Sequence, residues 1–166
     1  MIKAILASTS IGGIGNRGTL PWPKHAQDLA WFKEHTENNI VVMGRNTWED
    51  PKLPKPLPNR INYIVSSTHV DTKYQHLVRW IPNNPVENIL RIQKENPDKD
   101  VYIIVGKQLY ESTQDIVQEI YLTRMKGSWF TDTRMNLDKW FACFRIYGVR
   151  PGNNCTYEIW KRQFFI

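Results

Sequence analysis

The sequence is poor in cysteine and lacks long apolar runs, and these absences exclude several classes of protein. Cys143 and Cys155 are the only cysteines, they form no Cys-x-x-Cys pair, and the four histidines show no metal-ligand spacing. No apolar run reaches the roughly 18 residues that a membrane span needs, and the N-terminus has no secretory layout. We therefore expect no disulfide framework, no metal site and no membrane association, and we expect a cytoplasmic protein.

Basic residues outnumber acidic ones but are not concentrated anywhere. Lysine and arginine number 22 against 16 aspartates and glutamates, which gives a net charge of +6, yet no block of five basic residues occurs. The aromatic residues do not form the array with basic residues that binders of single-stranded nucleic acid use. The charge therefore favours a small phosphorylated or carboxylated ligand over nucleic acid.

The chain contains enough apolar sequence for one core. Its 166 residues and 41% hydrophobic content fit a single domain over residues 1–166. Short apolar runs typical of strands buried on both faces occur at residues 2–7, 40–43, 61–65, 101–105 and, more weakly, 119–123. Helical patterns lie between several of these runs, at residues 26–36, 86–94 and 108–118.

This alternation predicts a mostly parallel sheet. Residues 140–147 and 156–165 have a strand pattern and are separated by a turn region rich in glycine, proline and asparagine. They predict an antiparallel hairpin at the sheet edge. The predicted fold is α/β: one domain with a mostly parallel central sheet, an antiparallel C-terminal edge hairpin and flanking helices.

Polar residues and glycines follow three of the predicted strands. In open α/β sheets, ligands bind beyond the carboxyl ends of the strands. Glycines, hydroxyls and cations at that edge suit phosphate, although the same residues also start ordinary helices and turns. Taken together they favour an anionic ligand, most simply a dinucleotide. The three segments are Gly44-Arg45-Asn46-Thr47, Ser66-Ser67-Thr68 and Gly106-Lys107-Gln108.

The segment Gly13-Ile14-Gly15-Asn16-Arg17-Gly18 matches the pattern G-x-G-x-x-G after a strand. The dinucleotide-binding form of that pattern must open a helix. Here Pro21 and Pro23 flank Trp22, so a regular helix cannot continue. A mobile glycine-rich loop that covers a site, with Leu20 and Trp22 as apolar inserts, fits better.

Asp28 is the most suggestive single residue. It lies in the first turn of a predicted helix and shares a face with Phe32, next to Leu29. An acidic residue there also has an ordinary explanation, which is its favourable interaction with the helix dipole. Burial beside Leu29 and Phe32 distinguishes the two, because full desolvation raises a carboxyl pKa by about 3–5 units and suits a group that handles a proton.

Two further residues have both an ordinary and a functional explanation. Arg60 opens a predicted strand and is either a surface cation or, with Lys33 and Lys55, part of a rim that binds a carboxylate. Thr123 ends a predicted strand and is either a β-branched strand residue or a hydrogen-bond partner of a buried carboxylate.

Several motifs together resemble the dihydrofolate reductase family, in family order over almost the whole chain. They are Leu20-Pro21-Trp22, Asp28-Leu29-Ala30-Trp31-Phe32-Lys33, Val42-Met43-Gly44-Arg45-Asn46-Thr47-Trp48-Glu49, Pro56-Leu57-Pro58-Asn59-Arg60, Ile64-Val65-Ser66-Ser67, Leu109-Tyr110, Tyr121-Leu122-Thr123, Thr131-Asp132-Thr133 and Tyr157-Glu158-Ile159. One such motif is weak, but the ordered set is highly specific.

The resemblance implies NADPH-dependent reduction of 7,8-dihydrofolate, with hydride transfer from nicotinamide C4 to pterin C6 and protonation at N5. Asp28 matches the family's buried carboxylate and Thr123 its hydrogen-bond partner, with Leu20 and Trp22 in the same catalytic group. Arg60 matches the residue that binds the glutamate α-carboxylate as a bidentate pair. Dihydrofolate and antifolate inhibitors are the implied ligands of a protein that acts as a monomer.

The same resemblance implies the remaining binding residues. Those expected at the substrate are Ile5, Leu6, Leu29, Phe32, Lys33, Leu57, Ile104 and Tyr110. Those expected at NADPH are Ala7, Ile14, Gly15, Asn16, Gly18, Thr19, Gly44, Arg45, Asn46, Thr47, Ser66, Ser67, Gly106, Lys107, Gln108 and Leu109.

The chain departs from the family at two of these positions. Val105-Gly106 stands where the family usually has Gly-Gly in a cis peptide, and Gln108 stands where some members have a second cation for the 2′-phosphate. Arg45 with Ser67 is therefore expected to carry the preference for NADPH over NADH.

Three other functions stay open on the sequence. A pyrimidine reductase of riboflavin synthesis has a related fold but should lack the combination of Asp28, Phe32 and Arg60. A non-catalytic module would bind NADPH or folate without oxidising NADPH. Nucleic-acid binding would show a steep dependence of affinity on salt.

Overall fold

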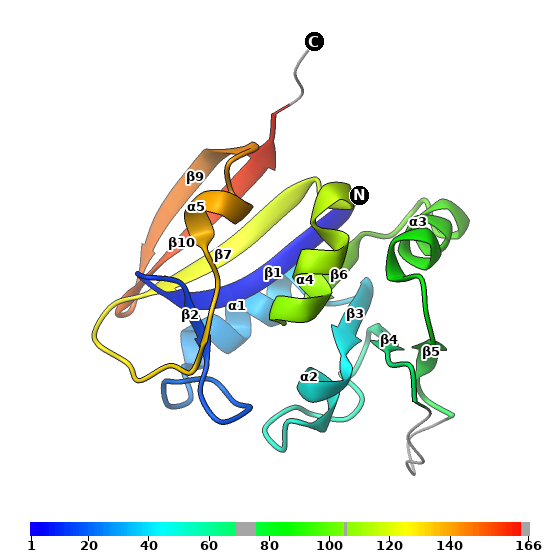
Figure 1. The fold of residues 1–166 in the computed structure, drawn as a ribbon, viewed down its shortest axis with the longest axis horizontal. Helices are drawn as coiled ribbons and strands as arrows, with labels where there is room; N and C mark the ends of the chain where they lie inside the picture. Colours follow the sequence, from blue (N-terminus) through cyan, green and yellow to red (C-terminus); the bar gives the residue numbers. More distant parts are fainter. Residues whose placement is uncertain (69–75, 105, 164–166) are drawn as a thin grey trace.

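A computed structural model describes residues 1–68, 76–104 and 106–163. Within these residues eight strands form one sheet in the order β5-β4-β3-β6-β1-β7-β10-β9 (Figure 1). The strands of this sheet are β1 (Ile2–Thr9), β3 (Ile40–Gly44), β4 (Ile61–Val65), β5 (Arg79–Ile81), β6 (Val101–Ile104), β7 (Glu119–Met125), β9 (Phe144–Gly152) and β10 (Cys155–Arg162). In this spatial order the strands from β5 through β4, β3, β6 and β1 to β7 pair in parallel. Strand β10 is antiparallel to both β7 and β9. The α/β fold class and the antiparallel edge hairpin are thus confirmed.

The helices and a small second sheet complete the described structure. The helical segments are α1 (Ala26–Thr36), α2 (Arg45–Glu49), α3 (Pro85–Glu95), α4 (Lys107–Thr113), the 3₁₀ turn η1 (Gln114–Ile116) and α5 (Leu137–Trp140). Strands β2 (Gly13–Gly15) and β8 (Thr133–Arg134) pair with each other outside the main sheet. Among the described helices none is long and apolar enough to cross a membrane.

The sheet has a hydrophobic cluster on each face because successive strand residues point to opposite sides. Ile5 and Trp31 belong to the cluster under α1, whereas Ala4, Leu6 and Tyr110 belong to the cluster under α3 and α4. Figure 1 shows α1 and α4 on opposite faces of β1 and β7. We call these the α1 face and the α4 face.

Two predicted elements differ from the structure. Residues 140–143 are not strand, since Trp140 ends α5, and β9 instead runs from Phe144 through Gly148 and Pro151 to Gly152. Proline is tolerated there because β9 is an edge strand, so the missing N–H interrupts no inner ladder. The helix expected over residues 108–118 ends at Thr113 and continues only as η1. The departure noted at Val105 lies outside the described residues.

Candidate active site

The site is built around Asp28, which α1 holds over the α1 face of the sheet. The Oγ1 of Thr123 on β7 donates a hydrogen bond of 2.7 Å to Asp28 Oδ1, although the two residues are 95 positions apart. Asp28 is half-buried, and burial raises the pKa of its carboxyl above the ordinary value of 3.8 against the lowering effects of Thr123 and His25. The structure thus favours the hypothesis that Asp28 is a partly desolvated carboxyl over the hypothesis that it is a solvated aspartate that only interacts with the helix dipole.

We expect Thr123→Val to raise the pKa of Asp28 further. The hydroxyl stabilises the ionised carboxylate, so its removal favours the protonated form. Carbon-detected NMR titration of labelled aspartate measures this shift directly. Thr123→Ser retains the hydroxyl and is the matched control, and an unchanged titration in the valine variant would contradict the assignment.

An apolar cluster lies on the α1 face, the same face as this carboxyl. Ile5 and Leu57 are buried there, with Ala7, Phe32 and Ile104 packed beside them, so five residues expected at the ligands lie in one cluster. Trp22 is also in this cluster and 3% exposed, while Leu20 is 43% exposed. Leu29 is 49% exposed, whereas α1 buries Trp31, and the role expected of Leu29 at the substrate stays a prediction.

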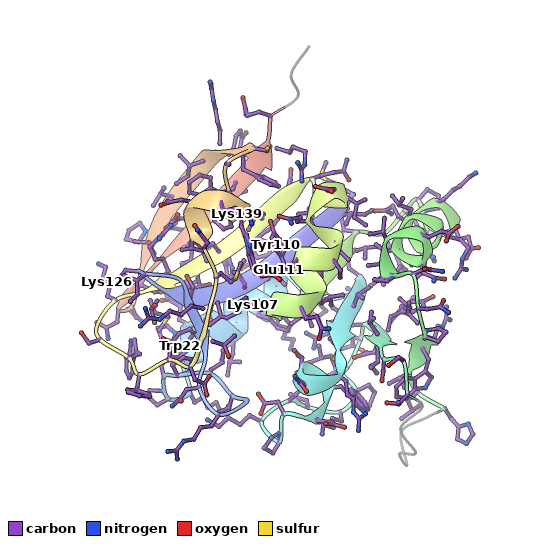
Figure 2. All side chains as sticks on the ribbon, in the orientation of Figure 1. Trp22, Lys107, Tyr110, Glu111, Lys126 and Lys139 are labelled. Carbon is purple, nitrogen blue, oxygen red and sulfur yellow. The ribbon has the colours of Figure 1, made fainter. Side chains whose placement is uncertain are left out.

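Leu6, Leu109 and Tyr110 lie on the other face of the sheet. Their side chains lie in the cluster on the α4 face, and the Tyr110 ring, which is 0% exposed, stacks on Trp140 at 4.4 Å. Figure 2 shows Tyr110 on α4, well away from Trp22. Strand alternation explains Leu6, since its neighbour Ile5 faces α1. The Leu6 and Tyr110 side chains thus lie on the face opposite Asp28, and the role expected of these residues at the substrate stays a prediction.

Arg60 lies beside Phe32 of this cluster and is held in one orientation. Its Nε donates to the carbonyl oxygen of Pro58 at 2.8 Å and its Nη1 to Thr36 Oγ1 at 3.0 Å. The guanidinium also lies 5.8 Å from the ring centroid of Phe32. Partial burial lowers the pKa of its guanidinium, which still stays cationic at neutral pH because arginine is not deprotonated in proteins. Among the described residues, these contacts involve Nε and Nη1, so Nη2 can donate to a carboxylate.

The polar segments that follow β3, β4 and β6 converge as predicted, since β4, β3 and β6 are neighbours in the sheet. A Cβ at Gly106 would lie 3.9 Å from Thr47 Oγ1, so the segments after β6 and β3 are close together. A Cβ at Gly44 would meet nothing within 4 Å, which leaves open space above its backbone. Arg45 is exposed and donates to Glu49 and to Thr68 Oγ1. These residues form a cationic, hydroxyl-rich edge.

The remaining residues of this edge are accessible to a ligand. Residues expected at NADPH that are exposed are Asn46, Ser67, Lys107 and Gln108, and Ser66 is half-buried. Lys33, expected at the substrate, is exposed on α1. Among the described residues no group of three or more potential metal ligands occurs.

The glycine-rich segment does not open a helix, which confirms the rejection of the dinucleotide-binding pattern. Gly13 and Gly15 belong to β2, and Asn16 and Thr19 pair with each other across a tight turn. Two hydrogen bonds tie the segment to the loop before β8: Arg17 N to Asp132 Oδ2 at 2.8 Å, and Asp132 N to the Gly15 carbonyl oxygen at 3.0 Å. The contact with Asp132 was not among the expected roles of these residues.

Sequence patterns also missed how the start of α1 is held. His25 caps the helix by accepting a hydrogen bond from Asp28 N, and both His25 and Gln27 contact the backbone of Asn153. A helix N-cap is usually Ser, Thr, Asp or Asn, so a histidine gives no signal of this role. Trp31 Nε1 is a buried donor without a hydrogen-bond partner among the described residues.

The arrangement suits one kind of chemistry. A carboxyl with a raised pKa lies on the same face as an apolar cluster, an arginine lies beside Phe32 of that cluster, and a cationic edge follows the strands. Such a site binds a flat heterocycle that carries a carboxylate, next to a phosphorylated ligand, and can hold a proton at the heterocycle.

Comparisons with known proteins point to one family. The sequence profile described as dihydrofolate reductase matches residues 1–161. Dihydrofolate reductase type 9 of Escherichia coli is 31% identical over 138 residues, which cover 82% of this chain and 76% of that protein. Dihydrofolate reductase type 8 of Escherichia coli is 29% identical over 164 residues, covering 98% and 96%. The structure of the Enterococcus faecalis dihydrofolate reductase, complexed with NADP(H) and RAB-propyl, superposes with a TM-score of 0.82 at 27% identity and covers 99% of this chain and 97% of that one.

Proposed function

Because the chain belongs to the dihydrofolate reductase family, we propose that Asp28 is the acidic group around which its reaction is organised. The protein is an enzyme that reduces 7,8-dihydrofolate to 5,6,7,8-tetrahydrofolate with NADPH. The cofactor supplies the hydride, which passes to C6 of the pterin, while N5 gains a proton. The observation that supports the role of Asp28 is its 2.7 Å hydrogen bond to Thr123 in a half-buried position on the α1 face.

Asp28 binds the pterin and promotes its protonation. Its carboxylate accepts hydrogen bonds from the 2-amino group and N3 of the pterin, and it favours protonation at N5 through water. Burial keeps the pKa of this carboxyl raised, so a proton is available at the site closer to neutral pH than an exposed aspartate allows. Thr123 fixes the carboxylate plane through Oδ1, so the other oxygen is directed to the substrate.

The apolar residues exclude water and orient the substrate. Ile5, Phe32, Leu57 and Ile104 belong to one cluster beside Asp28 and provide the flat walls that a pterin and a benzoyl ring require. Correct orientation of the reacting carbon and the removal of water are what such walls contribute to a hydride transfer.

Arg60 binds the α-carboxylate of the glutamate tail. Pro58 and Thr36 hold the guanidinium from one side, so its planar fork is oriented before the ligand arrives. Bidentate pairing with a carboxylate is the interaction for which an oriented arginine is best suited.

The edge formed after β3, β4 and β6 fits NADPH. The open space above Gly44, the hydroxyl of Thr47 near Gly106 and the exposed guanidinium of Arg45 provide close backbone approach, hydrogen bonds and positive charge. Arg45 with Ser67 binds the 2′-phosphate, the group by which NADPH differs from NADH. The segment from Ile14 to Thr19 contacts the nicotinamide end, with Ala7 beneath it.

We expect Arg45→Gln to lower the preference for NADPH over NADH. A hydrogen bond to a charged group contributes about 1.5–3 kcal/mol, so the ratio of kcat/KM for the two cofactors should fall roughly ten- to hundredfold. Steady-state rates with each cofactor measure the ratio. Lys52→Gln, an equal charge change at another exposed residue, is the control. An unchanged ratio in the Arg45 variant would place the 2′-phosphate elsewhere.

Loss of NADPH absorbance upon addition of dihydrofolate tests the activity itself. We expect turnover that an antifolate diaminopyrimidine inhibits. Turnover of an aminopyrimidine in place of dihydrofolate would indicate the pyrimidine reductase, and tight binding without oxidation of NADPH would indicate a non-catalytic module. Light scattering on the purified chain tests the further expectation that it acts as a monomer.

A further inference from the structure

The first turn of α1 and the tip of the β9–β10 hairpin are joined by side chains that no expected role accounts for. His25 Nδ1 accepts a hydrogen bond of 3.0 Å from Asp28 N, and Nε2 of the same ring lies 2.6 Å from the Asn153 carbonyl oxygen. Because Nδ1 accepts, the ring proton lies on Nε2, which donates to that carbonyl. One imidazole thus connects two segments that are 128 residues apart.

Gln27 completes this contact from the same helical turn. Its Oε1 accepts a hydrogen bond of 2.7 Å from Asn153 N, so the backbone donor and acceptor of Asn153 are both bound by side chains at the start of α1. The packing around them is tight. A Cβ at Gly152 would lie 2.9 Å from Gln27 Oε1, 2.8 Å from Cys155 Sγ and 2.5 Å from Tyr157 Cε2. We call His25, Gln27 and Asn153 the α1–hairpin clamp.

The clamp is also connected to the Asp28 carboxyl through strands β10 and β7. Asn153 immediately follows β9 and lies two residues before β10, and on β10 Tyr157 pairs with Thr123 of β7. Thr123 in turn donates to Asp28 Oδ1. Asp28 is therefore held at its backbone through His25 and at its carboxylate through Thr123, and the hairpin connects these two points.

We propose that His25 and Gln27 are positioning residues for Asp28, which fix α1 against the hairpin so that the carboxylate keeps its place over Thr123. The inference rests on the proposed role of Asp28. It predicts an effect on the hydride-transfer step and on its pH dependence, with no effect on the binding of NADPH, whose edge lies after β3, β4 and β6.

The pH dependence has a defined direction. The hydrogen bond from Thr123 lowers the pKa of Asp28, so loss of the clamp, which keeps the carboxylate over Thr123, should raise that pKa. The titratable groups that face Asp28 from β10 are Cys155 and Tyr157, and burial raises the pKa of both, so they stay neutral near pH 7. Because His25 is itself titratable and contacts Asp28 N, a shift of the midpoint is assigned to Asp28 where Gln27→Met, which keeps the imidazole, shows it as well.

The experiment compares His25→Asn, His25→Ala and Gln27→Met by stopped-flow measurement of NADPH oxidation across pH. Asparagine is a good helix N-cap but too short to reach Asn153, so His25→Asn separates capping from clamping. We expect His25→Asn and Gln27→Met each to slow hydride transfer roughly three- to tenfold and to raise the midpoint pH of the profile, with the KM for NADPH unchanged. Lys24→Gln, an exposed neighbour, is the control that keeps wild-type values.

Three results distinguish failure of the clamp proposal from failure of the proposed function. If His25→Asn retains the wild-type rate and midpoint while only His25→Ala loses them, His25 is a helix cap and the clamp is overturned. If neither Gln27→Met nor His25→Asn differs from wild type, the clamp is likewise overturned. If the wild-type protein does not oxidise NADPH with dihydrofolate, the proposed function fails instead. Binding of NADPH by fluorescence, retained in every variant, shows that each has folded.

Discussion

Asp28→Asn is expected to lower the rate of hydride transfer by about 10²–10⁴-fold at neutral pH, the range that a positioned acid–base group contributes. Asparagine has nearly the same shape and can still accept the hydrogen bond from Thr123 Oγ1, so the packing of α1 should persist. What it loses is the ionisable group that promotes protonation at N5. Single-turnover oxidation of NADPH with dihydrofolate measures the effect, and a rate near that of the wild type would remove Asp28 from the mechanism.

The same substitution should not destabilise the protein at neutral pH. Burial raises the pKa of Asp28, so the contribution of this carboxyl to stability is full below its ordinary pKa of 3.8 and is lost as pH rises through the raised value in the folded state. Near pH 7 the ionised carboxylate therefore costs stability, and asparagine avoids that cost. We expect an equal or higher melting temperature for Asp28→Asn, which separates loss of chemistry from loss of fold.

Arg60→Leu is expected to raise the KM for dihydrofolate roughly ten- to hundredfold, since a hydrogen bond to a charged group contributes about 1.5–3 kcal/mol. The kcat should change little, because the tail carboxylate is bound equally in the ground state and the transition state. Steady-state kinetics at saturating NADPH measure both parameters.

A substrate without the tail provides the control for this variant. A dihydropterin that lacks the glutamate has no carboxylate to bind, so its KM should be the same in Arg60→Leu and the wild type. Arg60→Lys should fall between the two, because lysine keeps the charge but loses the planar fork. If the KM for dihydrofolate is unchanged in Arg60→Leu, Arg60 is only a surface cation stacked on Phe32.

The buried strands were predictable because their apolar runs are continuous. A strand covered on both faces by helices has no polar face, so β3 and β4 begin at Ile40 and Ile61, as the sequence predicts. The edge strand β9 was not predictable in this way. It carries Gly148 and Pro151 and exposes Ile146, so its sequence has neither a regular alternation nor a continuous run.

The site could be predicted only in part. The pair Asp28–Thr123 joins residues 95 positions apart, and neither periodicity nor spacing reports such a contact, so it came from the resemblance to a family. Alternation along β1 could have placed Leu6 on the α4 face, since Ile5 and Ala7 face α1. The clamp residues gave no signal, because their partners are backbone groups of Asn153 and any residue has those.

The most direct test of the whole account is the rate of hydride transfer measured by stopped flow from about pH 5 to pH 9 in the wild type and in Asp28→Asn. We predict a wild-type rate that falls with rising pH through one ionisation whose midpoint lies above the ordinary aspartate pKa of 3.8, and a slow rate in the variant without that ionisation. A variant that keeps the wild-type midpoint and rate would show that the proton comes from another group.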